Sequence, residues 1–347
     1  IKGIRMVLKF FLLWGMIILG IFYIITYPYK SKLARKLKRV NSFEEIEFIK
    51  NSDESYSNIS QVEIDEYVTL EERNIKSSFV DEEMKYTIIT PKDNIKDGIP
   101  CLFLLHGLRD ENKDWMEKGK LLENYLSLLK KGDIEPMIFI LAGSGEEGQS
   151  WYSNFSAEKG YQYENYIISE LIPEIKRKVP KSPLGIVGFS MGGYAAFKLG
   201  LKYIDIFKVI GSFSGAINLV RMSVNRRVIR LFKFMYIPKF LFNDVDKRQF
   251  IRVFGSWGYK ILKEDPYSMI KYMEAEKLSN KYFYASVGIE DRVNHLMLQQ
   301  WLDVMGRMKK NKYNFKGYLC DGETHTWDYV ARDMTNFLKF FNEKINK

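Results

Sequence analysis

The chain has 347 residues, of which 46% are hydrophobic, and it carries a formal net charge of +10. This length is enough for one large α/β domain with a full core and an appended segment. The first 39 residues hold nine of the 53 lysines and arginines and none of the 43 acidic residues, so the remainder is almost neutral. Charge distributed in this way excludes a nucleic-acid-binding surface, and we expect no nucleic-acid partner.

Residues Phe10–Tyr27 form an uncharged, strongly apolar stretch between Lys9 and Lys30. As a helix, this stretch would measure roughly 27 Å, close to the ~30 Å hydrocarbon core of a bilayer. A cleaved signal peptide is the competing interpretation, although no small-x-small cleavage site follows. The sequence therefore predicts a single-pass membrane protein with its anchor over residues 1–39. It leaves open on which side of the membrane the remaining chain lies.

Residues 40–74 are polar and rich in acids, and we interpret them as a linker, or stalk, ahead of a catalytic domain over 75–347. The two cysteines, Cys101 and Cys320, both lie in apolar, strand-like runs. We expect these strands not to be neighbours in the sheet, so a disulfide could not form. Two buried free thiols are predicted.

From Ile75 onward, short apolar runs alternate with helix-forming segments. A hairpin is predicted over residues 77–90. The predicted buried strands are Pro100–Leu105, Pro136–Leu141, Leu184–Val187, Phe207–Ser212, Lys281–Val287 and Tyr313–Cys320, and the predicted helices span 118–131, 163–179, 191–203, 296–309 and 326–344. This alternation predicts an α/β fold with a mostly parallel, doubly wound sheet, helices on both faces and a site at the carboxyl ends of the strands.

About seventy residues separate two of these strands, far more than a crossover needs. We interpret residues 217–270 as a helical lid inserted over the site. This segment is basic, with many large apolar residues between the charges. Two interpretations stay open: the lid lies on a bilayer near the predicted anchor, or its apolar residues pack on the core.

The pentapeptide Gly188–Gly192 carries the strongest chemical signal, because an apolar strand precedes it and a helix-forming segment follows. In this context Gly-x-Ser-x-Gly is a nucleophile elbow, and it predicts Ser190 as the nucleophile. The glycines let strand and helix approach closely, which leaves the serine on a tight, exposed turn. The backbone N–H of Met191, in the first turn of the helix, is then an oxyanion donor.

A serine nucleophile needs a basic imidazole, and the chain has three histidines. His325 directly follows the last predicted strand, where the base belongs in this chain order, whereas His106 precedes the serine and His295 lies on or beside a helix. The orienting acid should end the preceding strand. Asp291 is favoured there, with Glu290 as the alternative.

The second oxyanion donor is expected in the loop after the Pro100–Leu105 strand, where Gly107 permits a turn and Leu108 supplies a backbone N–H. Arg109 in the same loop could bind an anionic group of the substrate, although a salt bridge to Asp110 or Asp114 is the simpler interpretation. No cluster of residues has the spacing of metal ligands, so we expect neither metal nor cofactor.

Several motifs resemble those of the "putative esterase" family of α/β hydrolases, which includes S-formylglutathione hydrolase (esterase D), feruloyl and acetyl-xylan esterases, and the antigen 85 mycolyltransferases. The matching segments are 104–109 with Trp115, 150–154, 188–194, 212–216, 288–291 and 322–327, collinear over about residues 75–344. The resemblance implies the α/β-hydrolase fold, a triad of Ser190, Asp291 and His325, and backbone donors at Leu108 and Met191. It also implies that Trp151 and Tyr152 line the acyl or leaving-group pocket.

Together these observations predict a membrane-anchored serine esterase that acts on a small-molecule, lipid or carbohydrate ester through an acyl-enzyme. An acyltransferase of the antigen 85 type is the first alternative. A catalytically silent, membrane-tethered binding protein is the second. The N-terminal segment and the basic lid depart from the family pattern, so the family's substrates do not carry over.

Overall fold

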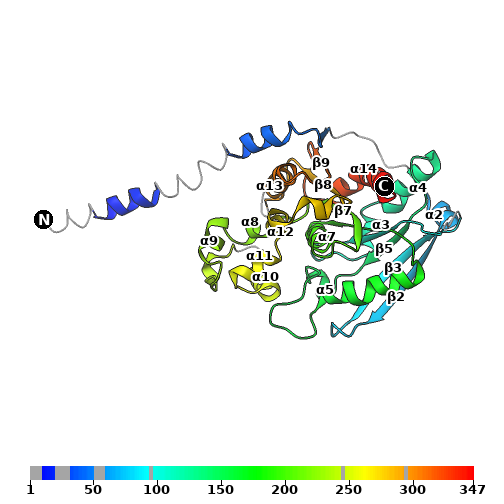
Figure 1. Cartoon of the computed structure of the whole chain (residues 1–347), viewed down its shortest axis with the longest axis horizontal. Coiled ribbons are helices and arrows are strands. Elements are labelled where there is room, and N and C mark those ends of the chain that lie inside the picture. The colour runs from blue at the N-terminus through cyan, green and yellow to red at the C-terminus, as the bar shows by residue number, and fades with distance from the viewer. Residues whose placement is uncertain (1–9, 20–31, 51–58, 94–96, 244–246, 293–295) are drawn as a thin grey trace. The chain divides into compact units, whose positions relative to one another are not determined.

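The computed structural model describes residues 10–19, 32–50, 59–93, 97–243, 247–292 and 296–347, which form two units, 1–44 and 45–347 (Figure 1). In the first unit, residues 10–19 and 32–40 are helical. None of the helices in the described ranges is long and apolar enough to span a membrane, which contradicts the predicted membrane anchor and single-pass localisation. The rest of the predicted span, residues 20–27, lies outside the described residues.

The second unit is built on a nine-stranded sheet in the order β1-β9-β8-β7-β6-β4-β5-β3-β2. β2 pairs antiparallel with β3, and β3 pairs antiparallel with β5, whereas all other pairs are parallel. The strands are β1 Ile46–Ile49, β2 Val68–Lys76, β3 Glu83–Pro91, β4 Cys101–Leu105, β5 Ile138–Ala142, β6 Leu184–Phe189, β7 Phe207–Phe213, β8 Tyr282–Gly288 and β9 Phe315–Cys320. The predicted mostly parallel α/β architecture is confirmed, because the apolar runs that predicted strands are buried on both faces.

Both edges of the sheet come largely from the acid-rich segment for which the sequence predicts a linker. β1 pairs with β9, and β2 pairs along its whole length with β3. Only the first residue of β2 is buried, so this strand lacks the apolar alternation by which strands are recognised. Charged, exposed edge strands of this kind prevent pairing with other chains. Helix α2, Gln61–Tyr67, lies between them in the sequence.

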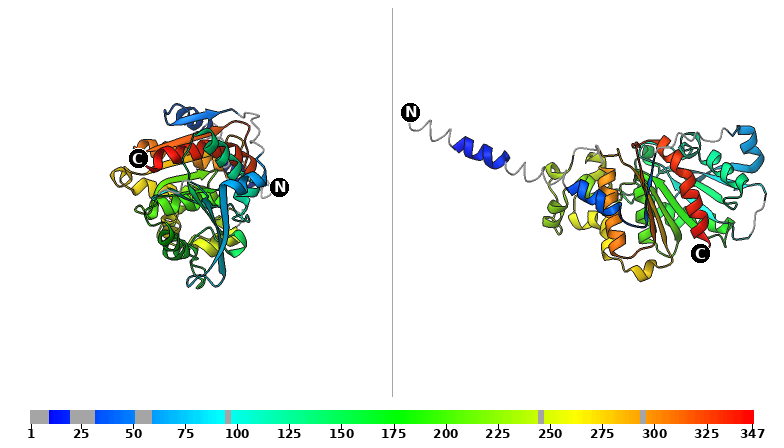
Figure 2. Two further views of the ribbon diagram at one scale, coloured as in Figure 1. Left: turned by 90° about the vertical axis from the view of Figure 1, so that its right-hand side faces the viewer. Right: turned by 90° about the horizontal axis from the view of Figure 1, so that it is seen from above.

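Helices cover both faces of the sheet. On β7, Gly211 abuts Phe337 of α14, whereas the preceding residue, Ile210, abuts Gly200 of α7. Successive residues of a strand point to opposite faces, so α7 and α14 lie on opposite sides of the sheet. Figure 2 (right) shows α14 in red and α13 in orange on either side of the strands. Besides α2, the helices of this unit outside the insertion are α3 Asp114–Glu117, α4 Leu121–Lys131, α5 Tyr163–Tyr166, α6 Ile172–Lys178, α7 Met191–Lys202, α13 Met297–Lys310 and α14 Trp327–Ile345, with η1 Glu146–Gly148 and η2 Ile167–Leu171.

The residues between β7 and β8 form the predicted helical insertion. Its elements are α8 Leu219–Ser223, α9 Arg226–Leu231, η3 Lys239–Leu241, α10 Lys247–Phe254, α11 Gly258–Lys263 and α12 Pro266–Tyr272, followed by η4 Ala275–Leu278. Phe250 and Phe254 are buried, whereas Phe234, Tyr236 and Phe240 are exposed. The insertion therefore packs partly on the core and leaves a second set of apolar side chains exposed.

Cys101 on β4 and Cys320 on β9 are buried free thiols, as predicted. Three strands separate β4 from β9 in the sheet, so the two sulfurs cannot pair. Burial raises the pKa of both thiols, which keeps them protonated and unreactive.

Candidate active site

Ser190 stands between β6 and α7 in a backbone conformation that few residues adopt, with φ 55° and ψ −113°. Two glycines make this turn sterically feasible. A Cβ on Gly188 would clash with the backbone of Gly192, and a Cβ on Gly192 would clash with the carbonyl of Leu105. The strand, turn and helix are thus pressed together, and the strained residue is held by contacts on both sides.

The structure brings together the three side chains singled out from the sequence. His325 Nε2 lies 2.8 Å from Ser190 Oγ, and His325 Nδ1 lies 2.7 Å from Asp291 Oδ2. A carboxylate only accepts hydrogen bonds, so Nδ1–H donates to Asp291 and Nε2 is left to accept from the serine hydroxyl. Asp291 is buried, whereas the His325 side chain is about one-third exposed.

Asp291 and not Glu290 faces the imidazole. The Glu290 carboxylate instead lies 3.1 Å from the Arg292 guanidinium. Asp291 is fixed by its backbone, because its N–H donates to the Gly288 carbonyl and its own carbonyl accepts from the Leu298 N–H. His295, the histidine that the sequence places nearest to this acid, lies outside the described residues.

The loop that carries His325 is anchored on both sides of the ring. Glu323, buried beside it, accepts hydrogen bonds from Arg332 on α14. On the other side, Thr326 caps α14 by accepting from the Tyr329 N–H. The imidazole itself packs on the Phe189 ring with centroids 4.9 Å apart. These contacts restrict the ring to the orientation in which it meets Ser190.

The two expected oxyanion donors, Leu108 and Met191, both line a pocket of about 300 Å³ that also contains Ser190 and His325. Within the described chain, no backbone carbonyl accepts from either N–H. Met191 is the first residue of α7, where a helix leaves its N–H groups without internal partners. Two free N–H groups beside the serine are what a developing oxyanion requires.

The predicted substrate-binding residues separate into one that lines this pocket and two that do not. Trp151 is part of the wall. Tyr152 is fully buried beneath it, with its hydroxyl 3.4 Å from the His106 carbonyl. Arg109 has an exposed side chain, and its N–H donates to the Gly148 carbonyl. Lys118 forms ion pairs with both Asp110 and Asp114.

Trp151 and Tyr152 both have positive φ angles, 56° and 47°, and a buried lysine holds this turn. Lys198 of α7 donates to the Tyr152 carbonyl at 3.0 Å and to the Ser153 hydroxyl at 2.6 Å. Its charge is balanced by buried Glu164 on α5, 2.9 Å away. Although burial alone would raise the pKa of Glu164, the charges of Lys198 and Lys202 bring it down to about 2.

Sequence reasoning missed this buried ion pair and part of the pocket wall. Asp110, Met222, Met297, Thr326 and Trp327 also line the pocket. Burial raises the pKa of the Asp110 carboxyl. The sequence suggests a role for Asp110 only as a salt-bridge partner of Arg109, and not as part of the pocket wall. The methionines come from the insertion and from the start of α13, and a single sequence gives no signal for their place.

His106 is excluded as the base. It is buried, burial lowers its pKa to about 4, and its Nε2 accepts from the Ser144 N–H at 3.1 Å. Its ring is neutral at neutral pH and links the ends of β4 and β5. In the described ranges, no group of three His, Cys, Asp or Glu side chains could hold a metal ion.

Comparison with known proteins gives the family. The family model described as "Putative esterase" matches residues 77–341. An acetyl esterase from Caldicellulosiruptor saccharolyticus is 24% identical over 259 residues, which is 73% of this chain and 86% of that protein. A diacylglycerol acyltransferase/mycolyltransferase Ag85A from Mycobacterium leprae is 29% identical over 126 residues, 34% of this chain and 37% of that protein.

Solved structures show the same fold at lower identity. An S-formylglutathione hydrolase from Agrobacterium tumefaciens aligns with a TM-score of 0.63 at 18% identity, over 80% of this chain and 96% of that one. A ferulic acid esterase aligns with a TM-score of 0.62, also at 18% identity, over 80% of this chain and 99% of that one. The family match extends over most of the chain, from β3 and its preceding loop to α14. The chain therefore belongs to the "putative esterase" family of α/β hydrolases.

Proposed function

We propose that the chain is a serine carboxylic-ester hydrolase in which Ser190 is the nucleophile, His325 the general base and Asp291 the acid that orients it. One observation carries this proposal: Asp291, His325 and Ser190 form a continuous hydrogen-bonded chain with links of 2.7 and 2.8 Å. Family membership independently supports an ester-hydrolysing enzyme.

In the proposed reaction, Ser190 Oγ attacks the ester carbonyl carbon while its proton passes to His325 Nε2. Asp291 stabilises the imidazolium that forms. The negative charge on the former carbonyl oxygen is held by the N–H groups of Leu108 and Met191, each worth about 3 kcal/mol of transition-state stabilisation. His325 then protonates the leaving alkoxide, and water deacylates Ser190 by the reverse proton path.

The pocket favours a short acyl group. Its volume of about 300 Å³ is at the small end of ligand sites, and aromatic and methionine side chains form most of its wall. An acetyl or butyryl group fits such a space, whereas a long acyl chain does not. The acetyl esterase among the relatives supports the same expectation.

The test is fluorophosphonate labelling of the full chain together with turnover of p-nitrophenyl acetate, butyrate and palmitate. Ser190→Ala and His325→Ala should each lower kcat by about 10⁴-fold or more, because triad members act as a unit. Labelling should disappear in Ser190→Ala. Ser279→Ala, at an exposed serine away from the pocket, is the matched control and should label and turn over like the wild type.

The outcome that contradicts the proposal is a wild-type protein, folded by circular dichroism, that neither labels nor hydrolyses any of the three esters. A protein of that kind would favour the silent binding-protein alternative. Labelling that survives in Ser190→Ala but is lost in another serine variant would instead move the nucleophile elsewhere.

A second function, acyl transfer, is favoured by one observation, the match to the mycobacterial acyltransferase/mycolyltransferase. The same acyl-enzyme would then be resolved by a sugar or lipid hydroxyl in place of water. Product analysis with a sugar or alcohol acceptor separates the two. Transfer product that dominates over free acid at low acceptor concentration would establish a transferase.

A further inference from the structure

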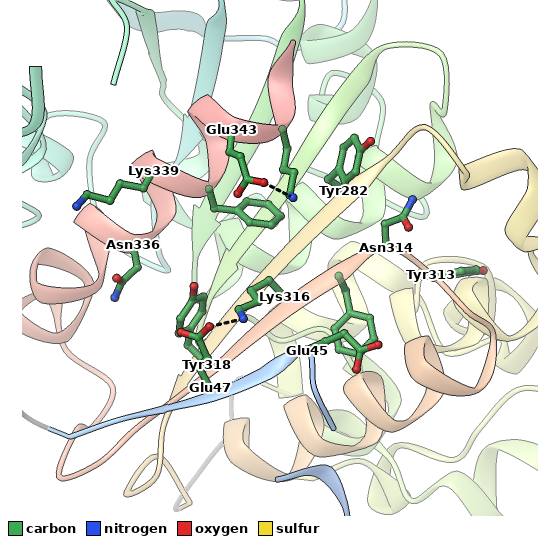
Figure 3. A pocket seen from close by; sticks show the side chains of 13 residues that line it. Glu45, Glu47, Tyr282, Tyr313, Asn314, Lys316, Tyr318, Asn336, Lys339 and Glu343 are labelled. Carbon is green, nitrogen blue, oxygen red and sulfur yellow. Dashed lines mark hydrogen bonds and ion pairs between the residues drawn. The ribbon is translucent and has the colours of Figure 1, made fainter. Parts of the chain in front are cut away.

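Among the cavities outside the catalytic pocket, two differ clearly in the charge of their walls. The first lies at the amino ends of β8 and β9, beside β1 and α14 (Figure 3). Its three glutamates are matched by three lysines, and Glu47 pairs with Lys316 and Glu343 with Lys344. The positive and negative charges of this cavity are therefore equal in number, and they leave no excess charge for a ligand to compensate.

The second, which we call the cationic pocket, has no such balance. It has a volume of about 480 Å³, and residues of α9, α11, α12 and α13 line it. These four helices are labelled in Figure 1. Six of the residues that line it are cationic and none is acidic. The six are Arg226, Arg230, Lys233, Lys263, Lys271 and Arg307.

Only one of these cations has an acidic partner among the described residues. Arg226 pairs with buried Asp265 at 2.6 Å. Arg307 donates to the Tyr267 hydroxyl, and its guanidinium lies 4.2 Å from the centre of that ring. Arg226 lies 4.0 Å from the same ring, so two like charges share one tyrosine. Arg307 and the four remaining cations have no acidic partner among the described residues, and a bound anion would compensate their charge.

Tyr272 also lines the pocket, and the nearby positive charges affect its hydroxyl group. Lys271 donates to the Tyr272 hydroxyl at 3.2 Å, and chiefly through this bond the pKa of Tyr272 is lowered, with Lys233 and Arg307 contributing. Apolar side chains form another part of the wall, notably Ile229 and Leu262. The cavity thus combines an excess of positive charge with an apolar surface.

We propose that the cationic pocket binds a phosphoryl group carried by a small molecule with an aromatic or apolar portion. A single carboxylate brings one charge and two oxygens, too few to compensate the five lining cations that have no acidic partner among the described residues. A phosphate monoester or diphosphate brings two or more charges and several acceptor oxygens, which suit guanidinium forks and ammonium groups together. The apolar wall and Tyr259 would contact the remainder of the ligand. This site is separate from the proposed catalysis.

The test is isothermal titration calorimetry of the full chain with inorganic pyrophosphate, and with acetate at the same ionic strength. We expect pyrophosphate to bind with a Kd of about 10–100 µM and acetate not to bind, with affinity falling as salt rises. The double variant Arg230→Glu/Lys271→Glu should weaken pyrophosphate binding by about tenfold or more. Both side chains are exposed at the rim, so the fold should persist, which circular dichroism checks.

The matched control is Lys239→Glu/Lys260→Glu, which changes the net charge equally at exposed lysines of the insertion outside the pocket. A parallel arm uses phosphatidylcholine vesicles with and without phosphatidic acid. Binding of pyrophosphate, lost only in the pocket variant, supports a soluble ligand. Binding of phosphatidic acid alone, lost only in the pocket variant, supports a lipid-borne phosphoryl group. Equal losses in both variants, or binding of neither probe, would overturn the proposal.

Discussion

Two strained turns meet at the catalytic pocket, and they are held in different ways. The turn at Ser190 is held by glycines two residues away on each side, which let backbone approach backbone. The turn at Trp151 and Tyr152 is held by Lys198, more than forty residues away, through hydrogen bonds to the turn and an ion pair with Glu164. The strained conformation at Ser190 therefore depends on a short, local sequence motif. The strained conformation at Trp151 and Tyr152 depends on contacts between residues far apart in the sequence.

The largest effect is expected at the first turn. Gly192→Ala places a Cβ against the Leu105 backbone, which cannot give way as a side chain could. We expect a loss of about 3 kcal/mol in stability. Displacement of Ser190 should also lower kcat/KM for p-nitrophenyl acetate by about a hundredfold.

Gly306→Ala in α13 is the control, since nothing lies within 4 Å of its added Cβ. It should stabilise the protein by about 0.5–1 kcal/mol, as alanine does within a helix, and leave kcat/KM unchanged. A Gly192→Ala variant with wild-type kinetics would show that the elbow is not held by this contact.

This difference explains which parts could be predicted from the sequence. Ser190, Asp291 and His325 each follow the carboxyl end of a predicted strand, so their convergence follows from the topology of a parallel sheet. Tyr152 could not be placed in this way. Its neighbour Trp151 reaches the pocket while Tyr152 points toward His106, and the turn that separates them depends on the remote Lys198.

Lys198 itself gave no signal, because a lysine on a helix is normally solvated. A buried lysine can be expected here only when the tertiary structure is known, because α5 then places Glu164 beside Lys198 on α7. The sheet edges were missed for a related reason. β1 and β2 gain their stability from backbone pairing and carry few buried side chains, so their acid-rich sequence resembles a linker. An apolar run predicted a membrane helix, but none of the helices among the described residues is long and apolar enough to span a membrane.

The second turn is tested by Lys198→Met. This variant removes both hydrogen bonds to the turn and leaves buried Glu164 with Lys202 as its remaining cation. We expect a loss of about 3 kcal/mol in stability, as when one partner of a buried ion pair is removed. kcat/KM should fall by about tenfold, since Trp151 is no longer held against the pocket.

The double variant Lys198→Met/Glu164→Gln separates stability from positioning. It should recover most of the stability, because no unbalanced charge is left buried, but not the activity, because the Tyr152 carbonyl still lacks its donor. Recovery of both would mean that the network supports the fold alone and does not position the turn.

The pH dependence of stability gives a smaller effect on the same network. Glu164 has its pKa lowered from 4.5 to about 2 in the folded protein, so its contribution is present above pH 4.5 and is lost as the pH falls toward 2. Between pH 5 and pH 3 we expect a loss of about 2 kcal/mol from this group. Urea unfolding at a series of pH values should show a shallower acid decline in Lys198→Met/Glu164→Gln. Identical slopes in the two proteins would contradict the assignment.

The smallest effect is expected in the loop that joins the two regions. Through Arg109, this loop donates to the Gly148 carbonyl ahead of the Trp151 turn, and a Cβ on Gly107 would lie 3.3 Å from the Phe189 ring beside the elbow. Asp110 in this loop lines the pocket beside Ser190, with Lys118 only 3.7 Å away as partial compensation. Its carboxylate should repel esters that carry a negative charge on the acyl part.

Asp110→Asn removes this repulsion while conserving the shape of the side chain. At pH 8, where the carboxyl is ionised, we expect kcat/KM for p-nitrophenyl hemisuccinate to rise about fivefold relative to p-nitrophenyl butyrate, a change of about 1 kcal/mol for a charge near the protein surface. The preference should weaken as salt is added, since screening reduces the repulsion in the wild type. Glu111→Gln, at an exposed acid of the same loop outside the pocket, changes the net charge by the same +1 and should leave the ratio unaltered. A ratio that moves equally in both variants would show that the net charge of the loop, and not Asp110 within the pocket, selects the substrate.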